Sequence, residues 1–249
     1  MRPDASKKIA TVTPKKGPNV VVIGAVIALT VVLAVVVAIV IGNNSKSGSS
    51  TAASGNAVPV GVVGGTGGGI LVDPAAKSTV PTLEVYADFQ CPVCGQFEKA
   101  FGSTLTDLAK TGQVKYVVHM MSFLDTNLPD SNNSSKRASN AAACAADAGK
   151  FIEYHSAVFA AQPAKEGAGY TNAQLTEFAQ TAGITGPALT TWQKCTDSGQ
   201  HNQYVADVAD TSGKAGVTST PTVKLNGTDI TKTLTTPESL IAAVKAAKS

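Results

Sequence analysis

Charged and aromatic side chains are scarce in this sequence, and their scarcity excludes one large class of partners. Of the 249 residues, 15% are charged and 5% are aromatic, and the formal net charge is only +3. Much of the positive excess lies in one short stretch, at Arg2, Lys7, Lys8, Lys15 and Lys16. Proteins that bind nucleic acid carry a basic surface that neutralises phosphates. Since the remainder of the chain has no basic stripe interleaved with aromatics, the sequence predicts no nucleic-acid partner.

Residues that ligate metal ions are also few. The chain has four cysteines and three histidines, and it contains one CxxC motif. The histidines, His119, His155 and His201, are scattered, whereas a zinc site needs three or four clustered ligands. We therefore interpret the histidines as ordinary strand or helix residues, and we expect the chain to need no metal ion or other cofactor.

One long hydrophobic run lies near the start of the chain. Residues 20–41 carry no charge, and as a helix rising about 1.5 Å per residue they would extend roughly 33 Å, enough to cross a bilayer. Because the basic stretch precedes this run, the positive-inside rule places residues 1–19 in the cytoplasm and the remainder outside. The pattern thus predicts a single-pass cell-membrane protein anchored in the lipid bilayer. A cleaved signal peptide is the alternative, although the run exceeds the usual length of about 7–15 apolar residues.

The exported part divides into a linker and a folded domain. Residues 42–69 consist mainly of Gly, Ser, Ala, Asn, Thr and Val, and the small polar residues among them bury too little apolar surface to order a chain. We predict a flexible linker there. Residues 70–248 carry the apolar patterns of a folded domain.

The folded domain begins with a β-α-β pattern. A β-rich run over residues 81–89 is followed by a helix, and a second β-rich run covers residues 113–123. Between about residues 125 and 216 only helix-like blocks follow. A hairpin turning at Asn226 and Gly227 and a final helix complete the pattern. This order indicates an α/β domain with a helical insertion.

The CPVC motif, Cys91 to Cys94, lies between the first strand and the helix that follows it. Two cysteines three residues apart share one helical face and can close a small disulfide ring. Cys91 would sit at the positive end of the helix dipole, which lowers the pKa of a thiol by stabilising its thiolate. A stabilised thiolate stabilises the reduced form, so such a site oxidises other thiols. Half of a zinc site and a purely structural bridge are the alternatives.

Two segments resemble a known family. YADFQCPVCGQFE resembles the DsbA-like branch of the thioredoxin superfamily, and GVTSTPTVKLNG is similar to that family's cis-proline strand. The resemblance implies an α/β, thioredoxin-like fold with a helical insertion, preceded here by one transmembrane helix. It also implies that Pro221 is cis, and that Thr220 and Pro221 lie opposite Cys91 and Cys94, where the Thr220 backbone can pair with an extended substrate. These four residues are the predicted catalytic residues.

One position departs from the family pattern. Many members carry a buried acid on the strand before the cysteines, at the position of Val85 here. Glu84 is adjacent, but alternation along a strand points it to the opposite face. We expect Glu84 to be exposed, which leaves any proton relay to water or to another group.

The remaining cysteines, Cys144 and Cys195, each lie in a predicted helix of the insertion. Cys144 is in an Ala-rich helix that permits close packing, and Cys195 shares a helical face with Trp192. We favour a structural disulfide between them, which would close a loop of about 50 residues and contribute about 4 kcal/mol to stability in the chain-entropy model. Two buried free thiols and a second redox pair are the alternatives.

These features predict an extracytoplasmic thiol–disulfide oxidoreductase that introduces disulfides into exported, thiol-containing proteins. The resemblance suggests that a membrane quinone-linked oxidase reoxidises the cysteine pair, and we expect a monomer. Two alternatives remain open. One is a reductase or isomerase of the same fold, for example in cytochrome maturation, and the other is a non-catalytic thioredoxin-like binding module.

Overall fold

A computed structural model describes residues 57–128 and 132–247 of the chain. The predicted cytoplasmic tail and membrane anchor, residues 1–19 and 20–41, lie outside the described residues, as does most of the predicted linker. Within the described ranges, no helix is long and apolar enough to cross a membrane.

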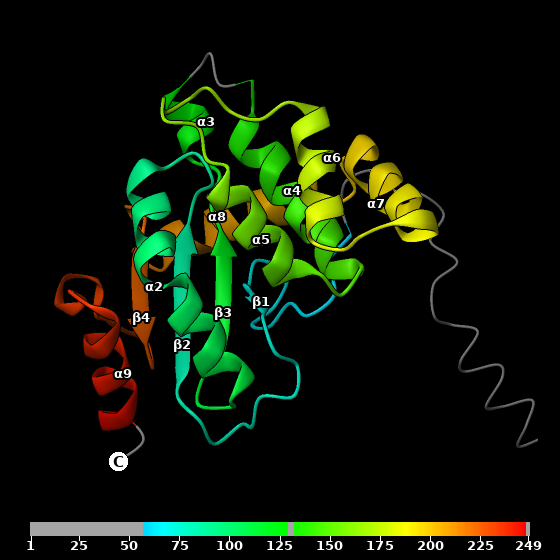
Figure 1. Cartoon of the computed structure of the whole chain (residues 1–249). Coiled ribbons are helices and arrows are strands. Elements are labelled where there is room, and N and C mark those ends of the chain that lie inside the picture. Colours follow the sequence, from blue (N-terminus) through cyan, green and yellow to red (C-terminus); the bar gives the residue numbers. More distant parts are fainter. Residues whose placement is uncertain (1–56, 129–131, 248–249) are drawn as a thin grey trace, which may run out of the picture. The chain divides into compact units, whose positions relative to one another are not determined.

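A five-stranded sheet forms the centre of the fold, in the order β1-β3-β2-β4-β5 (Figure 1). β2 (Thr82–Ala87) and β3 (Lys115–Met120) run parallel. β1 (Ile70–Leu71), β4 (Thr222–Leu225) and β5 (Thr228–Asp229) each pair antiparallel with their inner neighbour. The two central strands carry mostly buried residues, as expected for strands that are covered on both faces.

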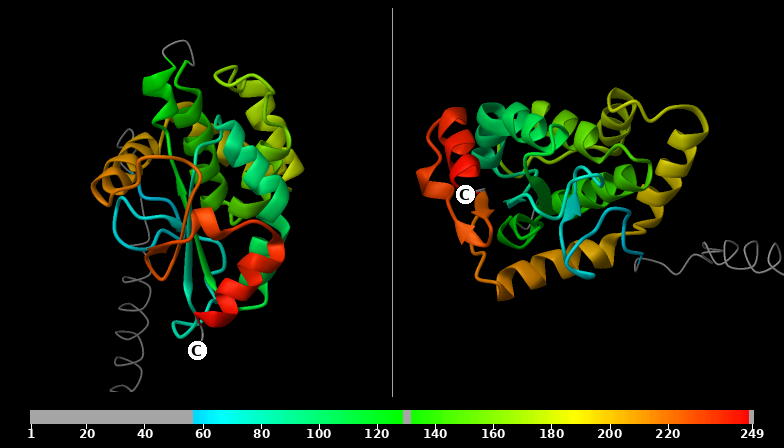
Figure 2. Two further views of the ribbon diagram at one scale, coloured as in Figure 1. Left: turned by 90° about the vertical axis from the view of Figure 1, so that its left-hand side faces the viewer. Right: turned by 90° about the horizontal axis from the view of Figure 1, so that it is seen from below.

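Helices cover both faces of the sheet. α2 (Pro92–Lys110) and α9 (Pro237–Ala246) pack on one face, and α8 (Asn202–Lys214) lies on the other (Figure 2). The register pairs Val85 with both Val118 and Val223, and all three side chains are fully buried. Apolar residues at helical spacing on α2 are also buried: Phe97, Phe101, Leu105 and Leu108. One part of the core therefore lies between the sheet and α2, directly behind the CPVC motif.

The predicted helical insertion is present between β3 and β4. Besides α8 it comprises α3 (Leu124–Asn127), α4 (Ser134–Asp147), α5 (Phe151–Ala160), α6 (Asn172–Thr181) and α7 (Gly186–Ser198). Thr171 caps α6, since its hydroxyl accepts the Gln174 N–H and the Gln174 side chain accepts the Thr171 N–H. The predicted hairpin turn is also present, with positive φ angles at Asn226 and Gly227.

The last part of the predicted linker, residues 57–69, is not a free tether. Gly67, Gly68 and Gly69 are buried, and the Tyr204 hydroxyl on α8 donates to the Gly68 carbonyl oxygen at 2.9 Å. A side chain at Gly67 would overlap Thr211 on α8. The prediction failed because glycine enrichment indicates flexibility in an isolated chain, whereas here it permits close contact between backbone and helix.

The predicted disulfide between Cys144 and Cys195 is present and joins α4 to α7. Their Cα atoms are 5.9 Å apart, within the normal range for a bridge. Beside it, the buried Trp192 ring donates its Nε1–H to the Ala141 carbonyl oxygen at 3.0 Å. The disulfide and this hydrogen bond fix the two helices of the insertion to each other.

We expect the double replacement Cys144→Ala, Cys195→Ala to lower the free energy of unfolding by about 4 kcal/mol, because the bridge closes a long loop in the unfolded chain. Urea denaturation of wild type and variant measures the difference. A loss below about 1 kcal/mol would show that the bridge does little for stability.

Candidate active site

The CPVC motif stands where β2 gives way to α2. Before the helix begins, the Cys91 N–H donates to the Asp88 carbonyl oxygen at 3.0 Å. Cys91 is the N-cap residue of α2, and Pro92 occupies the first helical position, where its missing N–H leaves no hydrogen bond unmade. The Gly95 N–H donates to the Cys91 carbonyl oxygen at 3.2 Å. The Cys91 sulfur is therefore carried on the N-terminal end of α2, as the sequence predicts.

The two cysteines differ in accessibility and in acidity. Cys91 keeps 7% of its surface exposed and Cys94 none, and both are free thiols. A hydrogen bond from the Cys94 side chain is the main cause that lowers the pKa of Cys91 to about 6; Thr220 and backbone N–H groups assist, and burial opposes the shift. Burial, followed by the neighbouring Cys91, raises the pKa of Cys94 far above its ordinary value. At neutral pH the pair is thus a Cys91 thiolate beside a Cys94 thiol.

Thr220 and Pro221 lie beside Cys91, although they are far away in the sequence. The peptide bond between them is cis, the isomer that the resemblance implies. In its thiol form Cys91 donates to the Thr220 carbonyl oxygen at 3.5 Å. β4 begins directly after Pro221 and pairs with β2, which leads into the CPVC motif. The structure therefore brings all four predicted catalytic residues together.

A buried carboxyl group that sequence reasoning missed lies just before the motif. Asp88 is fully buried, and it accepts hydrogen bonds from the Gln90 N–H (2.9 Å), the Ser135 hydroxyl (2.6 Å) and the Leu124 N–H (3.3 Å). Burial raises the pKa of Asp88 to about 7. Ser135 and Leu124 belong to the insertion. Asp88 therefore joins the insertion to the turn of residues 88–91 that precedes α2, which we call the redox turn. Its place at the end of a buried strand was the only signal in the sequence.

Glu98, one turn after Cys94 on α2, is a second buried acid. Burial raises the pKa of Glu98 to about 8 and lowers that of the fully buried His155 to about 3. The two side chains approach at 3.8 Å, so this contact joins two neutral groups rather than an ion pair. Among the described residues, neither ring nitrogen of His155 has a hydrogen-bond partner. The sequence interpretation of His155 as an ordinary helix residue did not anticipate this contact.

The expectation that Glu84 is exposed is wrong. Its side chain keeps only 24% of its surface, and it accepts hydrogen bonds from the Tyr86 hydroxyl (3.2 Å) and from His119 Nε2 (3.1 Å). The bond from His119 is the main cause that lowers the pKa of Glu84. Glu84 does point to the face opposite Val85, but α8 and the glycine-rich segment before β1 line that face. The alternation was therefore correct, and the covering of this face was what the sequence did not reveal.

In the part of the chain that the structure describes, no group of side chains is available to bind a metal ion. In that part, the Cys144, Cys195 and His201 side chains place potential ligand atoms within 4.8 Å of one another. The disulfide consumes both sulfurs. His201 instead contacts Asp147 through Nε2 (2.8 Å) and the Ala57 carbonyl oxygen through Nδ1 (2.7 Å). These bonds hold the N-terminal segment on the insertion.

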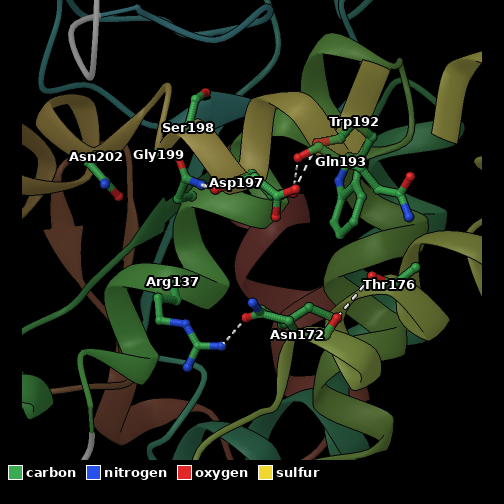
Figure 3. A pocket seen from close by; sticks show the side chains of 12 residues that line it. Arg137, Asn172, Thr176, Trp192, Gln193, Asp197, Ser198, Gly199 and Asn202 are labelled. Atoms are coloured by element: carbon green, nitrogen blue, oxygen red, sulfur yellow. Dashed lines mark hydrogen bonds between the residues drawn. The ribbon is translucent and has the colours of Figure 1, made fainter. Parts of the chain in front are cut away.

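A polar cavity of about 600 Å³ lies in the insertion, between α4, α6 and α7 (Figure 3). Arg137 donates to the Asn172 side chain at its edge, and the Thr176 hydroxyl donates to the Asn172 carbonyl oxygen at 2.9 Å. The described residues that line it include none of the four predicted catalytic residues. We therefore assign no step of the redox chemistry to this cavity.

A sequence profile of the family described as Thioredoxin matches residues 73–246 of the chain. This chain belongs to the thioredoxin family. The matched range includes both the CPVC motif and the cis-proline strand. The thioredoxin assignment agrees with the parallel β2–α2–β3 unit and with the cis proline beside the cysteines.

Two solved structures from Mycobacterium tuberculosis are similar to this thioredoxin-family chain in both fold and sequence. Oxidised DsbA is 32% identical with a TM-score of 0.58, and the match covers 76% of this chain and 91% of that chain. Reduced DsbG, described as a disulfide bond oxidoreductase, is 30% identical with a TM-score of 0.58, covering 82% and 90%. The chain is a DsbA-like thiol–disulfide oxidoreductase.

A curated relative of a different description shares part of the thioredoxin-family sequence. The serine/threonine-protein kinase PknE of Mycobacterium tuberculosis is 27% identical over 161 residues, which make up 62% of this chain and 28% of the kinase. This chain therefore spans little more than a quarter of that relative's length.

We expect Glu98→Gln to become more stable relative to wild type as the pH rises from about 4.5 to 8. The pKa of Glu98 is raised in the folded protein, so the folded wild type keeps a proton that its unfolded chain releases, and wild-type stability falls through this window. The difference in unfolding free energy should change by at least about 1 kcal/mol.

Urea denaturation of the oxidised protein, in which Cys91 cannot titrate, measures this difference. Glu153→Gln on the exposed side of α5 is the matched control. A difference that stays constant with pH would contradict a neutral, buried Glu98.

Proposed function

We propose that this chain is a membrane-anchored thiol oxidase that works outside the cytoplasm and introduces disulfides into exported proteins through Cys91 and Cys94. The observation that carries the proposal is the position of Cys91 at the N-terminus of α2 beside the cis Pro221, where hydrogen bonds lower its pKa to about 6. This value lies below the pKa of about 7 in thioredoxin and above the pKa of about 3.5 in DsbA. A lowered pKa favours the reduced form and therefore the oxidation of other thiols.

The reaction begins from the oxidised Cys91–Cys94 disulfide. A substrate thiolate attacks the Cys91 sulfur, the bond to Cys94 breaks, and a mixed disulfide forms between Cys91 and the substrate. Cys94 takes up a proton, because its pKa lies far above neutral. A second substrate thiolate then attacks the substrate sulfur, and Cys91 leaves as a thiolate. Two electrons pass from two substrate thiols to the cysteine pair, and the substrate gains a disulfide.

The surroundings of the cysteines suit this order of attack. Cys91 keeps some exposure and Cys94 has none, so an incoming thiolate reaches Cys91 first. Val93 between them is 55% exposed and offers an apolar contact to a bound protein. Thr220 and Pro221 are partly exposed beside Cys91, which supports pairing of the Thr220 backbone with an extended substrate segment.

Residues 20–41 would hold the enzyme in the cell membrane, with residues 1–19 in the cytoplasm and the catalytic domain on the other side. The uncharged apolar run and the basic residues before it support this arrangement. A membrane quinone-linked oxidase would return the cysteine pair to its disulfide form. One cysteine pair suffices for the cycle, so we propose that the enzyme acts as a monomer without a cofactor of its own.

The reduction potential of the Cys91–Cys94 pair tests the direction of the reaction. We expect a value between the about −270 mV of thioredoxin and the about −120 mV of DsbA, because the lowered pKa of Cys91 favours the reduced form. Equilibration of the purified protein with glutathione buffers measures it. A value at or below about −270 mV would instead favour the reductase of the same fold.

Replacement of Cys94 by alanine tests the order of attack. The variant retains the Cys91 thiol but cannot resolve a mixed disulfide internally, so cells expressing it should accumulate Cys91-linked complexes that a reducing agent dissolves. Cys91→Ala, with Cys94 intact, is the matched control. Equal trapping by the two variants, or no trapping by Cys94→Ala, counts against exchange through Cys91.

A further inference from the structure

The helical insertion reaches the redox turn through the segment that follows α5. Gln162 lies two residues beyond the end of α5, and its Nε2 donates to the carbonyl oxygens of Phe89 (2.8 Å) and Cys91 (2.9 Å). The Tyr170 hydroxyl, from the same segment, also donates to the Phe89 oxygen at 2.9 Å. The acceptors are 71 and 73 residues away from Gln162 along the chain. One side-chain amide thus bridges the backbone carbonyl groups of Phe89 and Cys91.

The partial negative charges of these carbonyl oxygens affect the stability of the Cys91 thiolate. The Cys91 oxygen accepts the Gly95 N–H, the first hydrogen bond of α2, and belongs to the same residue as the reacting sulfur. The negative end of a carbonyl dipole near a thiolate disfavours the anion, and a donor on that oxygen offsets the effect. The two N–H groups of Gln162 therefore act in the same direction as the helix N-terminus.

Gly95 leaves room for this contact. A β-carbon at Gly95 would overlap Oε1 of Gln162 and would lie 2.9 Å from its Cδ. The clash would fall on the end of a flexible side chain, so the carboxamide of Gln162 would move while the backbone of α2 could stay. Gly95 is thus a second position from which the Gln162 contact can be broken, without any change to Gln162 itself.

We infer that Gln162 is a positioning residue of the exchange reaction, which holds the turn before α2 and favours the Cys91 thiolate by binding the Phe89 and Cys91 carbonyl oxygens. The helical insertion then tunes the reactivity of the cysteine pair through one side chain. This inference rests on the proposed role of Cys91 as the exchanging thiol.

Three variants test it: Gln162→Leu removes the donors, Gln162→Glu puts an acceptor and a negative charge in their place, and Gly95→Ala displaces the carboxamide. Thiolate absorbance of the reduced, full-length protein is followed against pH, and the equilibrium with glutathione is measured. We expect the midpoint of Cys91 ionisation to rise by about half to one pH unit in Gln162→Leu and Gly95→Ala. It should rise further in Gln162→Glu, and all three variants should favour the disulfide form more than wild type.

Two controls separate this effect from general damage. Gln96→Leu changes an exposed glutamine on α2 that lines one groove together with Gly95 and Gln162, and Gly213→Ala adds a methyl group on α8 where no atom lies within 4 Å. Both should ionise as wild type does. The double variant Gly95→Ala, Gln162→Leu should shift no more than Gln162→Leu alone, since both changes break one contact.

The outcomes distinguish the two proposals. A wild-type midpoint at the ordinary value of a free cysteine, about 8.5, would overturn the proposed function. A low wild-type midpoint that stays unchanged in folded Gln162→Leu and Gly95→Ala would overturn the role of Gln162 and leave the proposed function standing.

Discussion

The chemistry of this protein depends on the hydrogen bonds that converge on the sulfur of Cys91. The Cys94 thiol donates to it, the Thr220 side chain and the first backbone N–H groups of α2 add to that, and together they outweigh the cost of burying the charge. The remainder of the domain can be understood as the frame that keeps these donors in place. The paired strands β2 and β4 place Cys91, which follows β2, next to Pro221, which directly precedes β4, and the core packed against α2 keeps Cys94 fully buried.

The insertion helps to hold these donors in place, because it forms hydrogen bonds with the residues just before α2. Asp88 is bonded to Ser135 on α4, and the Gln90 side chain donates to the same serine hydroxyl at 2.8 Å. Gln162 and Tyr170 reach the carbonyl oxygens of the same short turn. Five polar side chains thus join a turn of the thioredoxin part to the insertion. A buried polar network of this kind favours one arrangement, because separating the two parts would leave several buried groups unpaired.

Much of this structure could be predicted from local patterns in the sequence. The strands before and after α2, the capping of α6 by Thr171 and the hairpin at Asn226 each follow from rules that involve only neighbouring residues. The disulfide could be proposed because Cys144 and Cys195 lie in separate helices of one predicted insertion. The motif pair around Cys91 and Pro221 was sufficient to predict the site.

The predictions that failed concern contacts between distant segments. The glycines before β1 pack closely on α8, although the same composition is typical of a flexible linker. Glu84 is half-buried because that segment and α8 cover its face of the sheet. Burial raises the pKa values of Asp88 and Glu98, which the type of residue alone does not reveal. Gln162 has no local sequence signature, because its hydrogen bonds go to residues that are 71 and 73 positions away along the chain.

The central claim is that the fold itself stabilises the Cys91 thiolate, and folding free energy measures this directly. The pKa of Cys91 is lower in the folded than in the unfolded chain, so the reduced protein should gain stability relative to the oxidised protein as the pH rises, by about 2 kcal/mol between pH 6 and pH 8. Urea denaturation of both redox forms across this range provides the comparison. A difference between the two forms that does not change with pH would contradict the account.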